Sequence, residues 1–234
     1  MNKNQQLVLF DVGAVLLELN YSGLYEAGAR VTGETPKQFE QRYTDSKIES
    51  KVLSGEISNR KYLKELRSLL NNTSLTEGQL AKIVRNCWGN QINETVDLKK
   101  KIAESGYPVG VFSNINQFAI QILSKEFPEM FNTYRGPKIY SYQIGATKKD
   151  NPMFEKVQKM GFDNVIYIDD NEPYIRKALE FGWNGILFTP YIDPAEAIRQ
   201  TESFDISHSS TKFKQADNIK RLKQALKDFG IPLK

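Results

Sequence analysis

The sequence contains one cysteine and one histidine among its 234 residues. Cys87 has no partner within the chain, so no internal disulfide can form, and nothing indicates secretion or an oxidising compartment. Its place beside Trp88 is more typical of a buried core thiol than of a nucleophile. His208 lies in the polar segment SHSS, which is a poor setting for a catalytic triad. We therefore expect no chemistry that depends on cysteine or histidine.

Long apolar runs are also missing. No stretch approaches the ~20 apolar residues that a membrane-spanning helix needs. The first residues, MNKNQQLVLFDVG, carry one lysine and an apolar run that is too short for a signal peptide. Hydrophobic residues make up 40% and charged residues 26%, as in ordinary globular proteins. The sequence thus predicts a cytoplasmic globular protein with a sizeable core and no membrane partner.

Positive charge is concentrated near the C-terminus. The net charge is +4, but residues 211–234 carry seven Lys and Arg against two Asp. Apolar residues recur there at helical spacing, and Gly230 and Pro232 then stop the pattern. We expect a basic C-terminal helix at 211–234 that packs on the core. Such a segment could contact an anionic surface, yet a solvated helix face is the commoner case, and nucleic acid is not expected as a partner.

Short apolar runs alternate with helical patterns along the rest of the chain. The patterns predict strands at 6–11, 108–113, 138–141, 164–169 and 185–188, and helices at 95–105, 117–127, 153–160 and 173–181. This alternation predicts an α/β fold with a Rossmann-like parallel sheet and helices on both faces.

One connection breaks the alternation. Between the first and second strands the sequence shows only helical stretches, at 37–52, 59–70 and 76–87. Because a structureless loop of that length is implausible, we expect an inserted all-helical cap subdomain at 18–93. The core domain then comprises 1–17 and 94–210. Ligands of open α/β sheets bind at the carboxyl ends of the strands, so the insertion would cover the site.

Polar residues end three of the predicted strands: Asp11, then Ser113-Asn114, then Asp169-Asp170-Asn171. Taken singly, each is an ordinary turn or helix-cap residue. If the three strands are neighbours, however, the carboxylates and oxygen donors meet at one edge of the sheet. Such a ligand set suits a hard cation, and Mg²⁺ fits it.

The order of these motifs resembles that of the haloacid dehalogenase superfamily over nearly the whole chain. The family's strand followed by DxDx(T/V) is matched by LVLFDVGAV, and its strand ending in Ser or Thr by VGVFSN. Its lysine motif GxxKPDPxIF is matched by GATKKDNPMF, and its strand ending in paired acids by VIYIDDN. The FDxGxV strand and the turn GEIS also resemble a bacterial branch that includes an α-D-glucose-1-phosphate phosphatase.

The resemblance implies a set of roles. Asp11 would be the nucleophile of a phosphatase, forming an aspartyl-phosphate. Mg²⁺ would be held by Asp11, the backbone carbonyl of Gly13, Asp169 and Asp170. The phosphoryl group would be bound and its charge stabilised by Ser113, Asn114 and Lys148. Lys149 stands where the family usually has proline and could compete with Lys148 for this role. The resemblance implies a small phosphorylated metabolite, such as a sugar phosphate, as the substrate.

Gly13 departs from the family's pattern. Most of its phosphatases have a second aspartate there as general acid/base, a contribution of ~10²–10⁴ in rate. Glycine can offer its carbonyl to a metal but no proton to a leaving group. Two alternatives therefore stay open: a catalytically weak or silent binding protein with the same fold, and a carbon–halogen hydrolase. The paired acids Asp169 and Asp170 argue against the second, which needs no magnesium.

Overall fold

The computed structural model describes residues 5–189 and 211–233. Its centre is a parallel sheet with the strand order β5-β4-β1-β6-β7-β8. The strands are β1 (Gln6–Phe10), β4 (Val109–Ser113), β5 (Arg135–Tyr140), β6 (Asn164–Asp169), β7 (Asn184–Phe188) and β8 (Phe213–Ala216). The predicted α/β, Rossmann-like fold class is confirmed.

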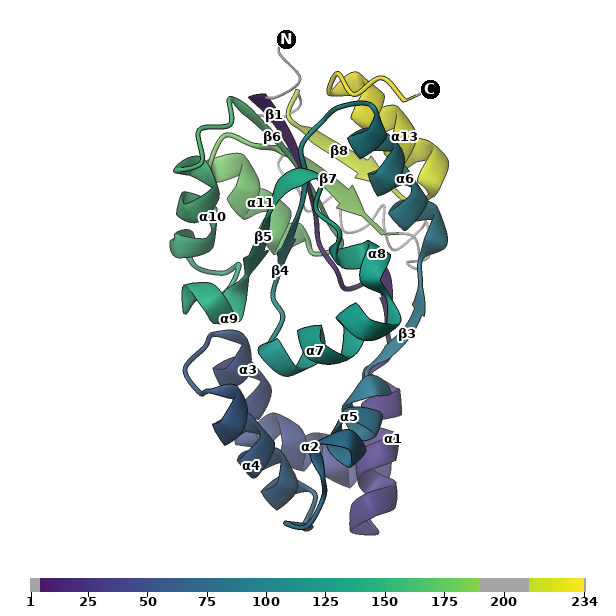
Figure 1. Ribbon diagram of the computed structural model, residues 1–234, viewed down its shortest axis with the longest axis vertical. Coiled ribbons are helices and arrows are strands. Elements are labelled where there is room, and N and C mark those ends of the chain that lie inside the picture. Colours follow the sequence, from purple (N-terminus) through teal and green to yellow (C-terminus); the bar gives the residue numbers. More distant parts are fainter. Residues whose placement is uncertain (1–4, 190–210, 234) are drawn as a thin grey trace.

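Helices cover both faces of the sheet (Figure 1). One face packs against α6 (Asn93–Glu104), α7 (Gln117–Glu126), α8 (Pro128–Phe131) and α13 (Ile219–Asp228). The other packs against α9 (Ser141–Ile144), α10 (Asn151–Gln158) and α11 (Glu172–Glu180). In β1, Val8 and Phe10 point to the first layer and Leu7 and Leu9 to the second, which explains its unbroken apolar run. Within the described residues, no helix has the length and apolar character needed to cross a bilayer.

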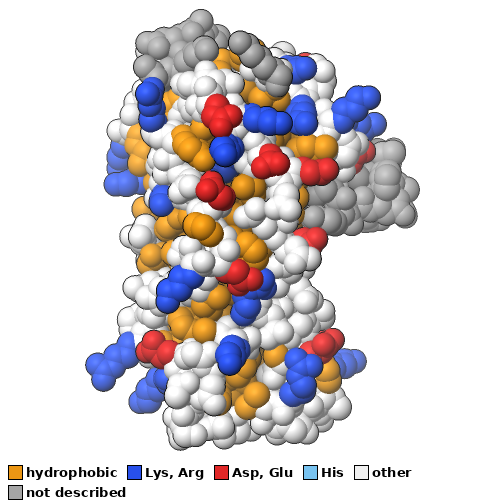
Figure 2. Space-filling model, turned by 45° about the vertical axis from the view of Figure 1, so that its right-hand side comes forward, with side chains coloured by type: hydrophobic (Ala, Val, Ile, Leu, Met, Phe, Trp, Pro, Cys, Tyr) orange, Lys and Arg blue, Asp and Glu red, His pale blue; other side chains and the backbone are white. Residues whose placement is uncertain are grey.

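The segment 211–234 is more than the predicted helix, because its first part forms the edge strand β8. The helical part, α13, buries Leu222, Ala225 and Leu226 against the core, as the spacing indicates. Its basic residues are partly balanced, with Arg221 3.0 Å from Asp217 across one helical turn. Figure 2 shows basic and acidic side chains interspersed over this end of the molecule. These charges form a mixed, solvated surface here.

Between β1 and β4 the chain forms a helical insertion around a hydrophobic cluster of its own. Its helices are α1 (Tyr21–Thr32), α2 (Pro36–Ser46), α3 (Ile48–Leu53), α4 (Asn59–Leu69) and α5 (Glu77–Arg85). The predicted helical stretch at 37–52 consists of two helices, because Lys47 adopts a left-handed conformation (φ 54°) that separates α2 from α3. Two short antiparallel strands at the base, β2 (Leu17–Leu19) and β3 (Trp88–Gln91), are also absent from the prediction.

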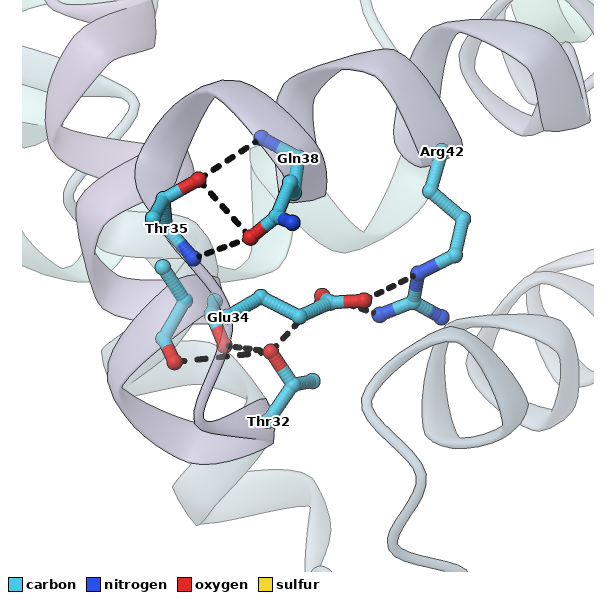
Figure 3. A network of polar contacts seen from close by, with 7 residues as sticks. Thr32, Glu34, Thr35, Gln38 and Arg42 are labelled. Atoms are coloured by element: carbon cyan, nitrogen blue, oxygen red, sulfur yellow. Dashed lines mark hydrogen bonds and ion pairs between the residues drawn. The ribbon is translucent and has the colours of Figure 1, made fainter.

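The corner between α1 and α2 shows how local sequence sets these helix limits (Figure 3). Thr35 accepts a hydrogen bond from the backbone N–H of Gln38, whose side-chain oxygen accepts from the Thr35 N–H in return. This capping box starts α2. Glu34 receives two hydrogen bonds from Arg42 (3.0 and 2.6 Å) and one from Thr32 (2.8 Å), which fix the corner.

The insertion is docked on helix α7. Phe118 of α7 lies in the hydrophobic cluster of the insertion, whereas Ala119 and Leu123 of the same helix lie in the core beneath the sheet. Arg85 at the end of α5 makes a two-pronged ion pair with Glu126 of α7 (2.6 and 2.7 Å). Helix α7 is therefore shared by both hydrophobic cores.

Candidate active site

Three neighbouring strands bring the predicted site residues together. Asp11 follows β1, Ser113 ends β4 and Asp169 ends β6, and the order β4-β1-β6 places β1 between the other two. The backbone N–H of Asp11 donates to the carbonyl of Ile168 (3.0 Å), so strand pairing continues to this point. The convergence expected from the strand ends is therefore present.

Asp11, Asp169 and Asp170 form a compact acidic cluster, with one oxygen of each lying within 4.8 Å of the others. Asp169 is fully buried and Asp11 nearly so. Burial, with the charges of Asp169 and Asp11, raises the pKa of Asp170 to about 8. Burial likewise raises the pKa of Asp169. Clustered carboxylates of this kind are costly without a cation, and their oxygen atoms suit Mg²⁺.

Lys148 supplies a positive charge within the cluster. Its Nζ atom lies 2.7 Å from Asp11 Oδ1 and 2.6 Å from Asp169 Oδ2, and the residue is 1% exposed. Burial opposes the ammonium charge, but the two carboxylates outweigh it and raise the pKa of Lys148. Its backbone N–H donates to Asn114 Oδ1 (2.9 Å). The competing residue Lys149 is exposed at the surface.

Two tyrosines in this network are not among the predicted site residues. The Tyr167 hydroxyl, fully buried, donates to Asp169 Oδ2, and the Tyr174 hydroxyl accepts from Asn114 Nδ2 (3.2 Å). The signal available for Tyr167 was its position two residues before Asp169 in the same strand, which places both side chains on one face. No signal in the local sequence predicts that Tyr174 contacts Asn114.

The loop after β4 is held firmly. The Ser141 hydroxyl accepts a hydrogen bond from the Ile115 N–H (3.1 Å), and the Asn116 side chain caps α7 by accepting from the Ala119 N–H (2.9 Å). Ser113 is 2% exposed and lines the cavity together with Asn114. Backbone N–H groups and a hydroxyl on a fixed loop of this kind can bind an anion.

Gly13 also lines the cavity, beside the acidic cluster. Its backbone does not adopt the left-handed conformation, although the next residue, Ala14, does (φ 53°). A Cβ atom at position 13 would point toward the side chain of Leu19. No carboxyl group occupies this position, so the core strand supplies no second acid here.

A cavity of about 260 Å³ lies between these core residues and the insertion. The insertion and its base contribute Leu19, Tyr21, Glu49, Leu53, Cys87 and Trp88 to its lining. Burial raises the pKa of the Cys87 thiol to about 12, so this cysteine is not a ready nucleophile. His208 lies outside the described residues.

Several solved structures with the same architecture are named as members of the haloacid dehalogenase family. A haloacid dehalogenase family enzyme from Bacteroides thetaiotaomicron, in complex with magnesium and inorganic phosphate, is 19% identical, with a TM-score of 0.69 over 83% of this chain and 99% of that chain. The chain has the haloacid dehalogenase fold.

Two more distant similarities cover almost the whole chain. A phosphatase of the same superfamily from Thermococcus onnurineus has a TM-score of 0.62 at 13% identity, over 98% of this chain and all of that one. An L-2-haloacid dehalogenase from Xanthobacter autotrophicus has a TM-score of 0.61 at 14% identity, over 99% and 100%. No protein-family model matches the sequence, and no curated protein matches it. The neighbours with this fold thus include both a phosphatase and a dehalogenase.

Proposed function

We propose that the protein is a magnesium-dependent phosphatase that hydrolyses a small phosphorylated metabolite through an aspartyl-phosphate intermediate. The observation that carries the proposal is the position of Lys148 between Asp11 and Asp169, on the floor of a cavity lined by Ser113 and Asn114. A buried nucleophilic carboxylate beside a fixed cation and an anion-binding loop suits attack on a phosphate ester. The magnesium and phosphate complex of the Bacteroides enzyme supports the same reading.

The acidic cluster fits the proposed metal. Asp11, Asp169 and Asp170 would hold Mg²⁺, and the backbone carbonyl of Gly13, beside them in the cavity, would complete the protein's contribution. When bound, Mg²⁺ supplies charge that screens the anionic nucleophile from the anionic substrate and polarises the phosphoryl oxygens.

The chain's own residues would carry out nucleophilic attack and bind the phosphoryl group. A carboxylate oxygen of Asp11 forms a bond to phosphorus while the bond from phosphorus to the ester oxygen breaks; water then attacks the aspartyl-phosphate and releases phosphate. Lys148 orients Asp11 before the reaction and stabilises the charge on the phosphoryl oxygens during it. Ser113, through its hydroxyl, and Asn114, through its backbone N–H, would bind the same oxygens.

Gly13 supports a second candidate, a weakly active or silent phosphate-binding protein. Without a carboxyl at this position, the ester oxygen has no obvious proton donor on the core strand. For an ester whose leaving group needs little protonation, such as the anomeric oxygen of a sugar or an aryl oxygen, the rate of hydrolysis would fall least. A sugar phosphate, which the sequence resemblance suggests, meets that condition.

The test is hydrolysis of p-nitrophenyl phosphate with Mg²⁺ or with EDTA. We expect turnover only with Mg²⁺, and a loss of about 10³-fold or more in Asp11→Asn, which keeps the size of the side chain but removes the nucleophile. Asp163→Asn, at an exposed site, is the matched control and should keep full activity. Phosphate binding without turnover would favour the silent protein. Metal-independent hydrolysis of a 2-haloacid would favour a dehalogenase.

A further inference from the structure

The two walls of the cavity differ in their chemistry. The core wall holds the acidic cluster with Lys148 and Ser113, where the phosphate would lie. The insertion and its base contribute Leu19, Tyr21, Glu49, Leu53, Cys87 and Trp88 to the rest of the lining. Among these six lining residues Glu49 alone carries a formal charge. Glu49 lines the same cavity as the core residues that would hold the phosphate, so it is the charged group available to the other end of a substrate.

Glu49 is held in place by Tyr21. The Tyr21 hydroxyl donates a hydrogen bond to Glu49 Oε1 (3.0 Å), joining α1 to α3 across the cavity wall. Burial raises the pKa of Glu49, against the opposing effect of this hydrogen bond. The Tyr21 proton is committed to Glu49, so the pair presents acceptor oxygens to the cavity.

We infer that Glu49 and Tyr21 recognise the end of the substrate opposite the phosphate, and that they select an uncharged or cationic hydrogen-bond donor, a hydroxyl or amino group, over a carboxylate or a second phosphate. This inference rests on the proposed function, since it takes the phosphate end from it. A hydroxyl or amino group satisfies the acceptor oxygens of the pair. An anionic group would instead meet the Glu49 carboxylate, and none of the other described residues that the insertion and its base contribute to the lining carries a positive charge.

The size of the cavity limits the substrate further. Its volume of about 260 Å³ is below the roughly 300–1,000 Å³ typical of pockets for drug-sized ligands. The apolar side chains of Leu53 and Trp88 flank the same wall and suit a short carbon skeleton. The expected substrate class is therefore a small monophosphate with hydroxyl or amino groups at its far end.

The test uses straight-chain alkyl phosphates of graded length that end in amino, hydroxyl, methyl or carboxylate groups. Binding is measured in the Asp11→Asn protein with Mg²⁺, where the esters stay intact, by the change in tryptophan fluorescence, since Trp88 lines the cavity and Trp183 is buried in the core. We expect the amino and hydroxyl esters to bind more tightly than the methyl ester, and the carboxylate ester to bind least. The order within the first pair separates a cationic from a neutral substrate.

Substitution at Glu49 is the decisive step. Glu49→Gln should improve binding of the carboxylate ester relative to the amino ester by about tenfold, or ~1.4 kcal/mol. Tyr21→Phe should also weaken the preference for the amino and hydroxyl esters over the carboxylate ester. The matched control is Glu77→Gln, the same charge change on an exposed part of the insertion, which should leave the ranking unchanged.

Three results would overturn the inference: a ranking in Glu49→Gln equal to that of the parent protein, an equal shift in Glu77→Gln, or no binding of any ester. Failure of the proposed function gives a different pattern, because it is judged by turnover of p-nitrophenyl phosphate in the protein with Asp11 intact. Selective binding without that turnover would leave the recognition by Glu49 standing and remove the phosphatase.

Discussion

A Cβ atom on Gly13 would lie 3.1 Å from Cδ2 of Leu19, a side chain that is 43% exposed. The contact is tight, yet it involves only the end of a flexible side chain that can turn toward solvent. Since the backbone of Gly13 avoids the left-handed region, a larger residue can be accommodated there.

Gly13→Asp should therefore fold and supply the missing acid. We expect kcat/KM for an alkyl phosphate to rise by roughly tenfold or more, while that for an aryl phosphate changes little, because only the alkoxide leaving group needs the proton. The control is Gly13→Ala, which adds the Cβ atom without a carboxyl. A wild-type enzyme that hydrolyses both esters equally well would mean that another residue already donates the proton.

Lys148→Met should destabilise the metal-free protein by about 3–5 kcal/mol, because it leaves two buried carboxylates without their cation. Urea unfolding in EDTA measures the loss, and added Mg²⁺ should restore part of it. The neighbouring Lys149→Met provides the control, since that side chain is exposed and should change stability by no more than ~0.5 kcal/mol. Equal losses in the two variants would contradict the placement of Lys148.

The stability of the metal-free protein should fall as pH rises from about 4 to about 8. Burial raises the pKa of Asp170 from 3.8 to about 8. Between these values the folded protein retains a proton that the unfolded chain has released, so the free energy of unfolding decreases with pH. Asp170→Asn should remove most of this slope, and Asp163→Asn none of it. Unfolding midpoints in EDTA across this range test the prediction, and a flat profile in the wild type would refute it.

Lys99 should be a strong contributor to stability away from the active site. It is 1% exposed, and its Nζ atom donates to the carbonyls of Met130 (2.8 Å) and Asn132 at the end of α8. Lys99→Met removes these donors from buried acceptors and should cost about 1–3 kcal/mol. Lys100→Met, exposed on the same helix, should be neutral. If chemical denaturation gave the same midpoint for both variants, the bonds to α8 would not stabilise the fold.

The core strands could be predicted because each carries its own local signal. The apolar runs that end in Asp11, Ser113 and Asp169 match β1, β4 and β6 within a residue. Their adjacency was only a condition of the predicted site, and the strand order β4-β1-β6 meets that condition. The choice of Lys148 over Lys149 came from motif alignment alone, and the structure places Lys148 beside both carboxylates.

The features that the sequence did not predict depend on distant partners. Strands β2 and β3 are too short to show a period of two, and they exist because Leu17 pairs with Gln91 across the whole insertion. The break at Lys47 uses a left-handed residue that is not glycine, which no turn signal announces. Glu49 and Tyr21 lie 28 residues apart in the sequence and meet only in the folded insertion.

Helix α7 connects the insertion to the proposed phosphate site. Its N-cap residue Asn116 and its helical residue Ala119 line the cavity, while Phe118 packs in the hydrophobic cluster of the insertion. If the insertion moves away from the sheet, either α7 moves with it or the Phe118 ring becomes exposed to solvent. Exposing the ring would cost about 1.5–3 kcal/mol. If the protein hydrolyses a phosphate ester as proposed, substrate entry and phosphate release are coupled, because a motion of the insertion that opens the cavity also moves Asn116 and Ala119 in its lining.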